Sequence, residues 1–397
     1  MSESEKKLEQ MLKDFEKANP DAGKVLRQLV DETPALKGNL LTSIEKGNLE
    51  RIEPTPASMP SSIPGFYVPK TEKLPTGEEL KANSIHISTA ELIDAGKDPK
   101  IANTMRLIMT HESEHALNKQ SILKADKDFV DKLEGIAKGP SPHDYTSVLA
   151  DKGKSDRLRE ATDQIGGFNA VAAHVFKQNP GATEAQLNKK LYDSSPEMAP
   201  YFDVKGTAPK ETYELKAGLT LGKDGQLART PENIEAMAKH FYDARPYQQN
   251  YGTRDLARAL QTEFATQAAE AAKDPAYKAP EVKVNLKELG LQHLSPHLPI
   301  GVTDTSPSPY IRGVTPEPAP APREGHAHPH GSEGHQQNFQ EMLKQLNITP
   351  QDREQFRNEG REQFQQLQMQ KAQEAKPAQP TQDAPVQEAA PRKVGAI

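Results

Sequence analysis

The chain has 397 residues, of which 33 are proline and 25 are glycine, and aromatic residues make up only 5%. This length allows two ordinary domains, but the composition favours one compact core joined to flexible parts. The 50 basic and 56 acidic residues give a net charge of -6, which argues against a nucleic-acid partner bound through phosphate neutralisation. Because there is no cysteine, histidines and carboxylates must hold any metal ion.

The first residues, MSESEKKLEQMLKDFEKANPD, are charged, and no apolar run of the chain approaches the length of a membrane span. We therefore expect a protein made in the cytoplasm without a signal peptide and with no membrane span. Specialised bacterial secretion machines export proteins without a cleaved leader, so secretion by such a system stays open.

The N-terminal part, residues 1–52, is predicted to be a small helical segment. Leu8, Leu12 and Phe15 have helical spacing, and a second apolar cluster follows at 25–30 after a Pro-Asp break. The next residues, EPTPASMPSSIP at 53–64, are rich in proline and serine and are typical of a linker.

A strand followed by a long helix is predicted next. Ile85 and Ile87 alternate with polar residues as in a half-buried strand, and Ser88 or Thr89 can cap a helical turn after it. The following helix, from about 99 to 120, has a broad apolar face and contains the sequence HESEH.

Further helices are predicted along the rest of the core, which we place at 65–275. They lie at about 123–137, 154–177, 185–192, 231–244 and 254–272, and Thr230 before Pro231 gives a capped start to one of them. Residues 276–323 are predicted to be a Pro-rich linker, and residues 324–397 a His- and Gln-rich tail.

The HESEH sequence carries the chemistry. His111 and His115 are four residues apart, so on a helix both imidazoles project from one face and reach one tetrahedral ion. Glu112 lies beside the first histidine, where its carboxylate can take a proton from metal-activated water and pass it to the departing amine.

At these residues the chain resembles the zincin superfamily of zinc metallopeptidases, over about 84–118. The resemblance implies a Zn²⁺ cofactor and an α+β fold, with a mainly helical core and a small sheet. Glu114 departs from the family pattern, which prefers uncharged residues between the two histidines.

A catalytic zinc ion needs a third protein ligand. No third histidine follows His115 closely, whereas Glu160 lies on a second helical pattern 45 residues beyond it and is followed by small and polar residues that allow close helix packing. This arrangement resembles the gluzincins and implies Glu160 as the ligand. Asp163 is then expected to orient a histidine, although Asp156, four residues before Glu160, leaves the roles of the acids open.

Other histidines and tyrosines are weaker candidates. His86 lies in the predicted strand and His174 in an apolar helix, and both are expected to have ordinary structural roles. Tyrosines at 242, 247 and 251, with His240 and Arg245, form a cluster that could steady an oxyanion, but a structural role is favoured.

The sequence therefore predicts a zinc metallopeptidase that hydrolyses peptide bonds of a protein or peptide substrate. The Pro-rich linker and the tail are typical of a bacterial secreted effector, with secretion machinery or an immunity protein as partners. The tail is similar in composition alone to the export domains of Xanthomonas-type type IV secretion effectors. A hydrolase of peptidoglycan cross-links and a non-catalytic adaptor remain as alternatives.

Overall fold

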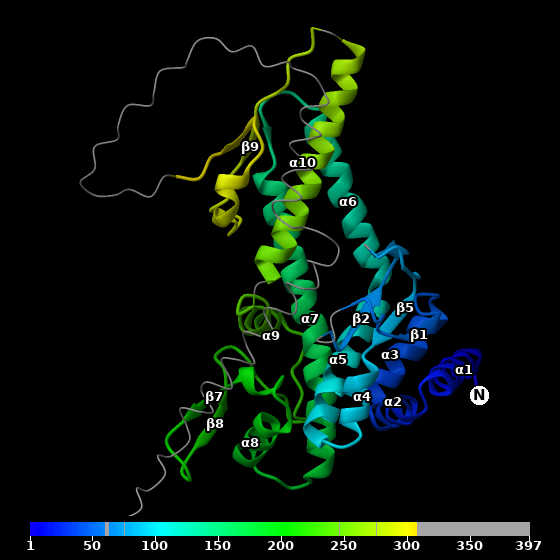
Figure 1. Cartoon of the computed structure of the whole chain (residues 1–397). Coiled ribbons are helices and arrows are strands. Elements are labelled where there is room, and N and C mark those ends of the chain that lie inside the picture. The colour runs from blue at the N-terminus through cyan, green and yellow to red at the C-terminus, as the bar shows by residue number, and fades with distance from the viewer. Residues whose placement is uncertain (60–62, 75, 246, 275, 308–397) are drawn as a thin grey trace, which may run out of the picture.

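The computed structural model describes residues 1–59, 63–74, 76–245, 247–274 and 276–307. These residues form a mainly helical α+β fold with small sheets, as predicted (Figure 1). The α-helices are α1 (Glu3–Ala18), α2 (Pro20–Glu32), α3 (Pro34–Glu45), α4 (Thr89–Ala95), α5 (Pro99–Leu117), α6 (Lys119–Ala137), α7 (Thr146–Gln178), α8 (Glu184–Ser194), α9 (Pro231–Met237) and α10 (Tyr247–Lys273). Short 3₁₀ or π turns lie at η1 (Ala199–Tyr201), η2 (Ala238–Tyr242) and η3 (Gln292–His297).

The sheet next to the motif helix has three strands in the order β1-β5-β2. Its central strand β5 (Ser84–Ile87) pairs in parallel with β1 (Arg51–Pro54) and antiparallel with β2 (Gly65–Val68). The strand predicted around Ile85 is therefore confirmed. Since β2 has no further strand beside it among the described residues, it forms one edge of this sheet.

The remaining strands form two short pairs and a second three-stranded sheet. They are β3 (Glu72–Lys73) with β4 (Glu79–Leu80), β7 (Phe202–Lys205) with β8 (Thr212–Leu215), and a three-stranded sheet in the order β10-β9-β6, formed by β6 (His143–Asp144), β9 (Val282–Val284) and β10 (Val302–Asp304).

The N-terminal helices belong to the same core as the motif helix. Leu8, Leu12 and Phe15 of α1 are buried, as their spacing predicts, and they share one apolar cluster with Met105 and Met109 of α5. The structure differs here from the predicted boundary at 53–64, because part of that stretch forms β1 and pairs with β5. A segment rich in proline can still form an edge strand, where no second ladder of hydrogen bonds is needed.

Helix α5 lies between two apolar clusters, which is why its sequence is apolar on more than one face. Met105 and Met109 face the N-terminal helices and the sheet, whereas Leu107 and Ile108 face α7 and α9. Asp98 caps its first turn by accepting a hydrogen bond from the backbone N–H of Lys100. The helix that carries HESEH is thus fixed on both sides by burial of apolar surface.

Two glycines let α7 approach α5 closely. A Cβ atom added at Gly167 would lie 2.7 Å from the backbone oxygen of Leu107, and one added at Gly166 would lie 2.6 Å from Oε1 of Glu114. Both distances are shorter than real Cβ contacts, so no other residue fits without a shift. The small residues predicted after Glu160 therefore have the predicted effect on helix packing.

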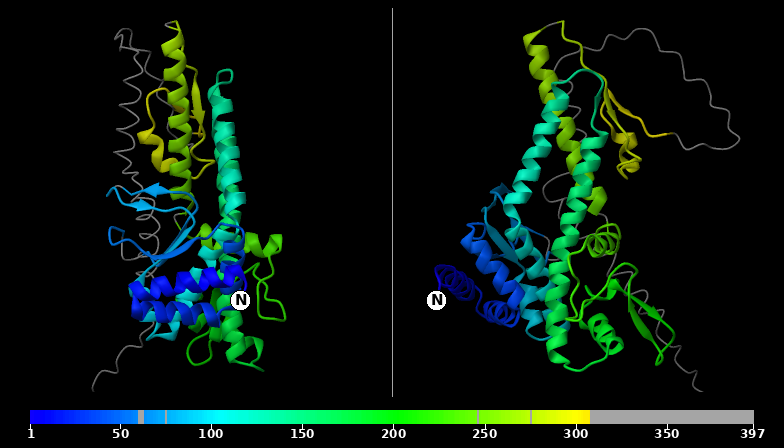
Figure 2. Two further views of the ribbon diagram at one scale, coloured as in Figure 1. Left: turned by 90° about the vertical axis from the view of Figure 1, so that its right-hand side faces the viewer. Right: turned by 180° about the vertical axis from the view of Figure 1, so that it is seen from behind.

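Helices α6, α7 and α10 extend side by side beyond the sheet and give the molecule an elongated shape (Figures 1 and 2). They form a third apolar cluster with β9 and the turn after it. The structure differs here from the predicted linker at 276–323, because residues 282–304 include two strands that pack on α10 and α7. The rest of that linker, from 308, and the tail at 324–397 lie outside the described residues.

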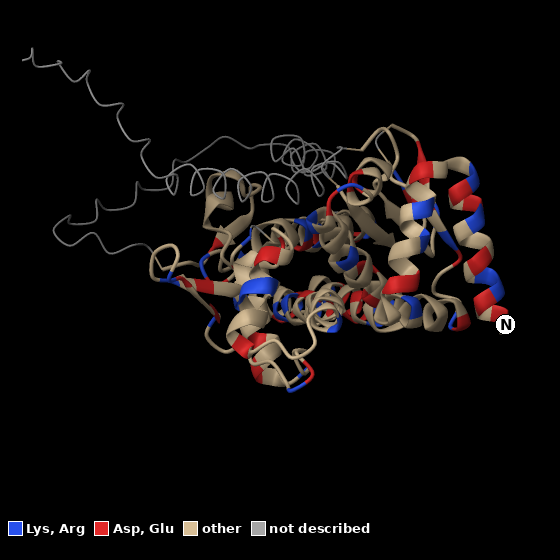
Figure 3. Cartoon of the chain, turned by 90° about the horizontal axis from the view of Figure 1, so that it is seen from below, with Lys and Arg blue, Asp and Glu red and all other residues tan. Residues whose placement is uncertain are grey.

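Basic and acidic residues are interspersed along the helices and do not form a basic stripe on the face seen in Figure 3. Within the described ranges, no helix is both long and apolar enough to cross a membrane.

Candidate metal centre

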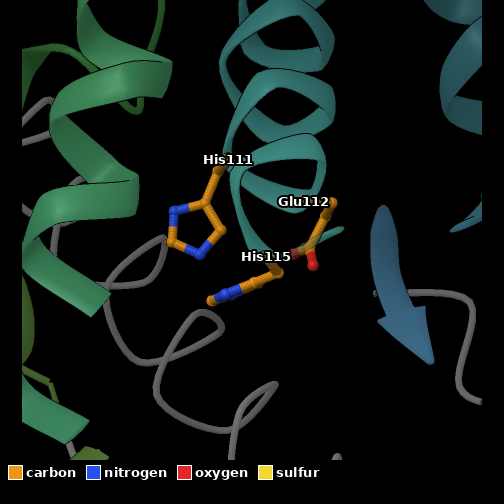
Figure 4. Close-up of side chains that lie close together, drawn as sticks. All are labelled: His111, Glu112 and His115. Carbon is orange, nitrogen blue, oxygen red and sulfur yellow. The ribbon is translucent and has the colours of Figure 1, made fainter. Parts of the chain in front are cut away.

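His111 and His115 project from the same side of α5, one helical turn apart (Figure 4). Their ring centroids are 4.7 Å apart and the rings are nearly perpendicular. Both side chains are largely buried, with 10% and 13% of their surface exposed. The structure therefore places the two predicted histidines where they can bind one ion.

Glu160 of α7 lies opposite these histidines. Its Oε2 atom is 3.4 Å from Nε2 of His111 and 3.7 Å from Nε2 of His115. Zinc binds nitrogen and oxygen ligands at about 2.0 to 2.2 Å, so any two ligands of a tetrahedral ion lie about 3.4 Å apart. Two imidazole nitrogens and one carboxylate oxygen are ligand types that zinc binds, and the two distances to Glu160 are close to this spacing.

Asp163 lies behind His115 and fixes the orientation of its ring. The Oδ2 atom of this buried carboxylate is 2.8 Å from Nδ1 of His115, which leaves Nε2 turned toward Glu160. The Nδ2 group of Asn118, at the end of α5, donates to Oδ1 of Asp163 at 3.0 Å. A carboxylate on the far nitrogen of a histidine is the usual support of a metal ligand.

Asp156 has a different environment, so the two acids do not exchange roles. Its carboxylate is 2.5 Å from Nζ of Lys152 and 2.7 Å from Nη1 of Arg159. Both of its close partners are therefore cations and not histidines. Of the acids considered on this helix, Glu160 and Asp163 are the two that contact the motif histidines.

Glu112 is held by the edge strand. The backbone N–H of Tyr67 in β2 donates to its Oε2 atom at 3.0 Å, so this N–H faces the cleft and not β5. Glu112 also lies near both histidines, since one ligand-type atom from each of the three residues falls within 4.8 Å of the others. Glu112 and Glu160 thus both lie near the two histidines, and the hydrogen bond from β2 fixes the position of the Glu112 carboxylate.

Electrostatics keeps Glu160 ionised. Burial by itself opposes ionisation, but the charge of His115 and a hydrogen bond from His111 hold the pKa of Glu160 well below its usual range. Burial likewise opposes a charge on His115, but Glu160 and Asp163 outweigh it and raise the pKa of His115 to about 9. The two buried carboxylates therefore demand positive charge, from a proton on His115 or from a metal ion.

Glu114, the residue that departs from the zincin pattern, points away from the metal centre. Its Oε1 atom accepts hydrogen bonds from Nδ2 of Asn39 in α3 and from the guanidinium of Arg229 before α9. The side chain packs against Gly166 of α7. Glu114 thus connects α5 to three other parts of the fold.

Two adjoining cavities, of about 250 and 40 Å³, meet at the candidate metal centre. Glu112, His115, Glu160 and Tyr247 line both of them. The larger one extends between β2 and helices α7 and α10, and the smaller one extends toward Phe241. The side chains of the candidate metal centre therefore border both spaces.

The tyrosine cluster takes part in both packing and the site. Tyr242 stacks on Tyr247 and Tyr251, with centroid distances of 5.4 and 6.0 Å, and the rings of Tyr247 and Tyr251 are tilted at 6.2 Å. The hydroxyl of Tyr251 also donates to Oε1 of Glu160 at 3.0 Å. The sequence did not indicate this contact, because the predicted helix began at 254 whereas α10 begins at Tyr247.

Three other histidines considered from the sequence have structural contacts that do not involve His111 or His115. His86 is buried, stacks on Phe66 at 4.8 Å and lies 2.9 Å from the hydroxyl of Ser84. His174 forms a hydrogen bond with Gln178, and His240 forms one with the backbone oxygen of Ala217. The residues that the sequence missed are Arg159 and Arg254, which line the larger cavity.

Comparison with models of known protein families, with curated proteins and with solved structures finds no match to this chain. The functional argument therefore depends on the geometry of the site.

Proposed function

We propose that this protein is a zinc-dependent peptidase of the gluzincin type, in which His111, His115 and Glu160 hold the ion. The observation that carries the proposal is the approach of Glu160 Oε2 to within 3.4 and 3.7 Å of the two Nε2 atoms. Each ligand comes from a helix that the core fixes in place. The contact of Asp163 with His115 adds the support that metal-binding histidines usually have.

A zinc ion bound here would supply Lewis acidity and lower the pKa of water in the site. Glu112 is then the general base, because it lies beside the histidines and is held by the backbone N–H of Tyr67. Its carboxylate takes a proton from the attacking water and returns it to the departing amine. Tyr251 holds Glu160 through its second oxygen, which keeps the ligand in one orientation.

A polypeptide is the substrate that fits the cleft. The edge strand β2 borders the larger cavity, and the N–H of Tyr67 shows that its unpaired edge faces the site. An extended peptide can add to such an edge through main-chain hydrogen bonds, which are independent of sequence. This arrangement favours a peptide bond as the bond that is cut.

Zinc content tests the metal centre directly. We expect about one zinc ion per chain in the purified protein, measured by atomic emission after dialysis. Glu160→Gln should lose most of the zinc, whereas Asp156→Asn, the same change on the same helix, should keep it. A wild-type protein without zinc after incubation with the metal would leave only a non-catalytic role, such as the adaptor.

Catalysis is tested by Glu112→Gln, which should keep zinc and lose hydrolysis, whereas His111→Ala should lose both. Hydrolysis is measured on casein and, separately, on peptidoglycan fragments. An active Glu112→Gln protein would refute the assignment of the base. Cleavage of peptidoglycan alone would show a cell-wall hydrolase with the same site.

A further inference from the structure

The larger cavity beside the metal centre has two unlike walls. One wall comes from the β2–β4 region and is mostly apolar, with Phe66, Val68 and Leu80 among its residues. The other wall comes from α7 and α10 and includes Arg159 and Arg254. We call this space the basic cavity after these two arginines; Glu72, Glu112 and Glu160 also line it. It touches Glu112, His115 and Glu160, so a group bound in it lies next to the reacting bond.

Two carboxylates, Asp156 and Asp255, pair with the cations on and behind the second wall. Asp156 lies 2.5 Å from Lys152, 2.7 Å from Arg159 and 3.7 Å from Arg254. Asp255 lies 3.1 Å from Arg254 and 3.9 Å from Lys152. Three cations thus share two carboxylates. Both acids contact more than one cation, so neither can neutralise one fully.

Glu160 contributes less negative charge to this network when a metal ion is bound. It lies 3.8 Å from Arg159, which makes it the third carboxylate of the network. As a zinc ligand, however, its charge is shared with a divalent ion. A bound ion would therefore leave Arg159 with less compensation from Glu160 than the free carboxylate gives. The apolar wall contains one acidic residue, Glu72 of β3.

Arg254 is the cation best placed to meet a ligand. Its side chain is 32% exposed, against 19% for Arg159 and 8% for Lys152. Its guanidinium lies over the ring of Tyr251, at 4.7 Å from the ring centre, and this contact holds it at the cavity wall. A guanidinium fixed in this way offers a planar set of donors that matches a carboxylate.

We propose that the basic cavity binds a carboxylate of the substrate next to the bond that is cut. The carboxylate comes from a glutamate or aspartate side chain or from the free C-terminus of the peptide, since both present the same group. The apolar wall fits the methylene stem of the residue and the arginine wall fits its charged end. This inference depends on the proposed peptidase function and adds the class of substrate to it.

The first test uses the wild-type protein with zinc bound and a library of peptides from a digested proteome. Cleavage sites are identified by mass spectrometry. We expect acidic residues or a free C-terminus to be enriched within two residues of the cut. Synthetic peptides with glutamate, glutamine or lysine at that position, and with a free or amidated C-terminus, then distinguish a side chain from a terminal carboxylate.

The matched variants are Arg254→Gln and Lys190→Gln, which remove the same charge from the cavity and from the exposed surface of α8. We expect kcat/KM of the wild type for the glutamate peptide, or for the free C-terminus, to exceed that of its neutral counterpart about tenfold or more. Arg254→Gln should remove most of this ratio and Lys190→Gln should not change it. A ratio within one protein does not depend on the folded fraction.

Binding gives a readout that does not need catalysis. The same peptides, labelled with a fluorophore, are titrated with zinc-loaded Glu112→Gln protein and followed by anisotropy. We expect the acidic or free-carboxylate peptide to bind about tenfold more tightly than its neutral counterpart, and Arg254→Gln to abolish the difference.

Two results would overturn the inference in distinguishable ways. Cleavage of library peptides without any preference for a carboxylate would refute the basic cavity as a carboxylate site and leave the peptidase function intact. A lack of cleavage of every peptide by zinc-loaded protein would refute the proposed peptidase function, and the substrate class with it.

Discussion

Replacing Gly167 by alanine tests whether close packing of α7 on α5 builds the metal centre. The added Cβ atom would lie 2.7 Å from the backbone oxygen of Leu107 and 3.2 Å from its Cγ atom. A backbone atom cannot rotate away, so the two helices must separate by several tenths of an ångström. Because Glu160 and the histidines sit on these two helices, such a separation also moves the ligands apart.

The effect of Gly167→Ala on the free energy of unfolding is best measured against Gly153→Ala, a control in the same helix. Nothing lies within 4 Å of a Cβ atom at Gly153, so this control should gain about 1 kcal/mol from the better helix propensity of alanine. Gly167→Ala has the same gain, but overpacking costs about 1 to 3 kcal/mol. We therefore expect the free energies of unfolding of the two variants to differ by about 1 to 3 kcal/mol.

The assay is urea unfolding followed by circular dichroism, with zinc affinity as a second measurement. Gly153→Ala should keep the zinc affinity of the wild type, whereas Gly167→Ala should bind zinc more weakly, because its ligands are displaced. If Gly167→Ala were as stable as Gly153→Ala and bound zinc equally well, the close contact of the two helices would not be what positions Glu160.

Three further predictions concern parts of the chain around the site. Asp163→Asn should weaken zinc binding about tenfold to a hundredfold, measured by competition with a chelator, because an amide supports His115 less well; unchanged affinity would count against this role. Glu114→Ala should lower the free energy of unfolding by about 1 to 3 kcal/mol and leave zinc content unchanged, since it breaks buried contacts that do not involve the ion; loss of zinc would contradict this. A reporter fused to residues 324–397 should be exported by a bacterial secretion system, and its retention in the cell would argue against the effector prediction.

Much of the candidate metal centre could be predicted from local sequence. The spacing of His111 and His115 fixes their common face on any helix, and the apolar residues around them predict that the helix is buried. Glu160 could be selected because the residues after it are small enough for one helix to lie against another. In the structure, its Oε2 atom does lie near both histidines.

The roles of the neighbouring acids could not be separated from sequence alone. Asp156 and Asp163 both lie within one helical turn of Glu160, so spacing permits either to approach a histidine. The rotation of α7 against α5 decides between them, and this rotation depends on contacts of Gly166 and Gly167 with the other helix. The sequence could not show the role of Glu114 for the same reason, because its partners Asn39 and Arg229 are far from it in the chain.

By itself, the sequence determined the short-range features of this protein: the helix that carries HESEH, the strand at Ile85, the caps at Ser88 and Thr230, and the absence of cysteine ligands. The tertiary structure alone decided that β1 and the N-terminal helices complete the core around α5, and that Arg254 lines a cavity beside the candidate metal centre. The physical reason is that local preferences depend on neighbours in the chain. Pairing of strands and charges depends instead on which distant segments burial brings together.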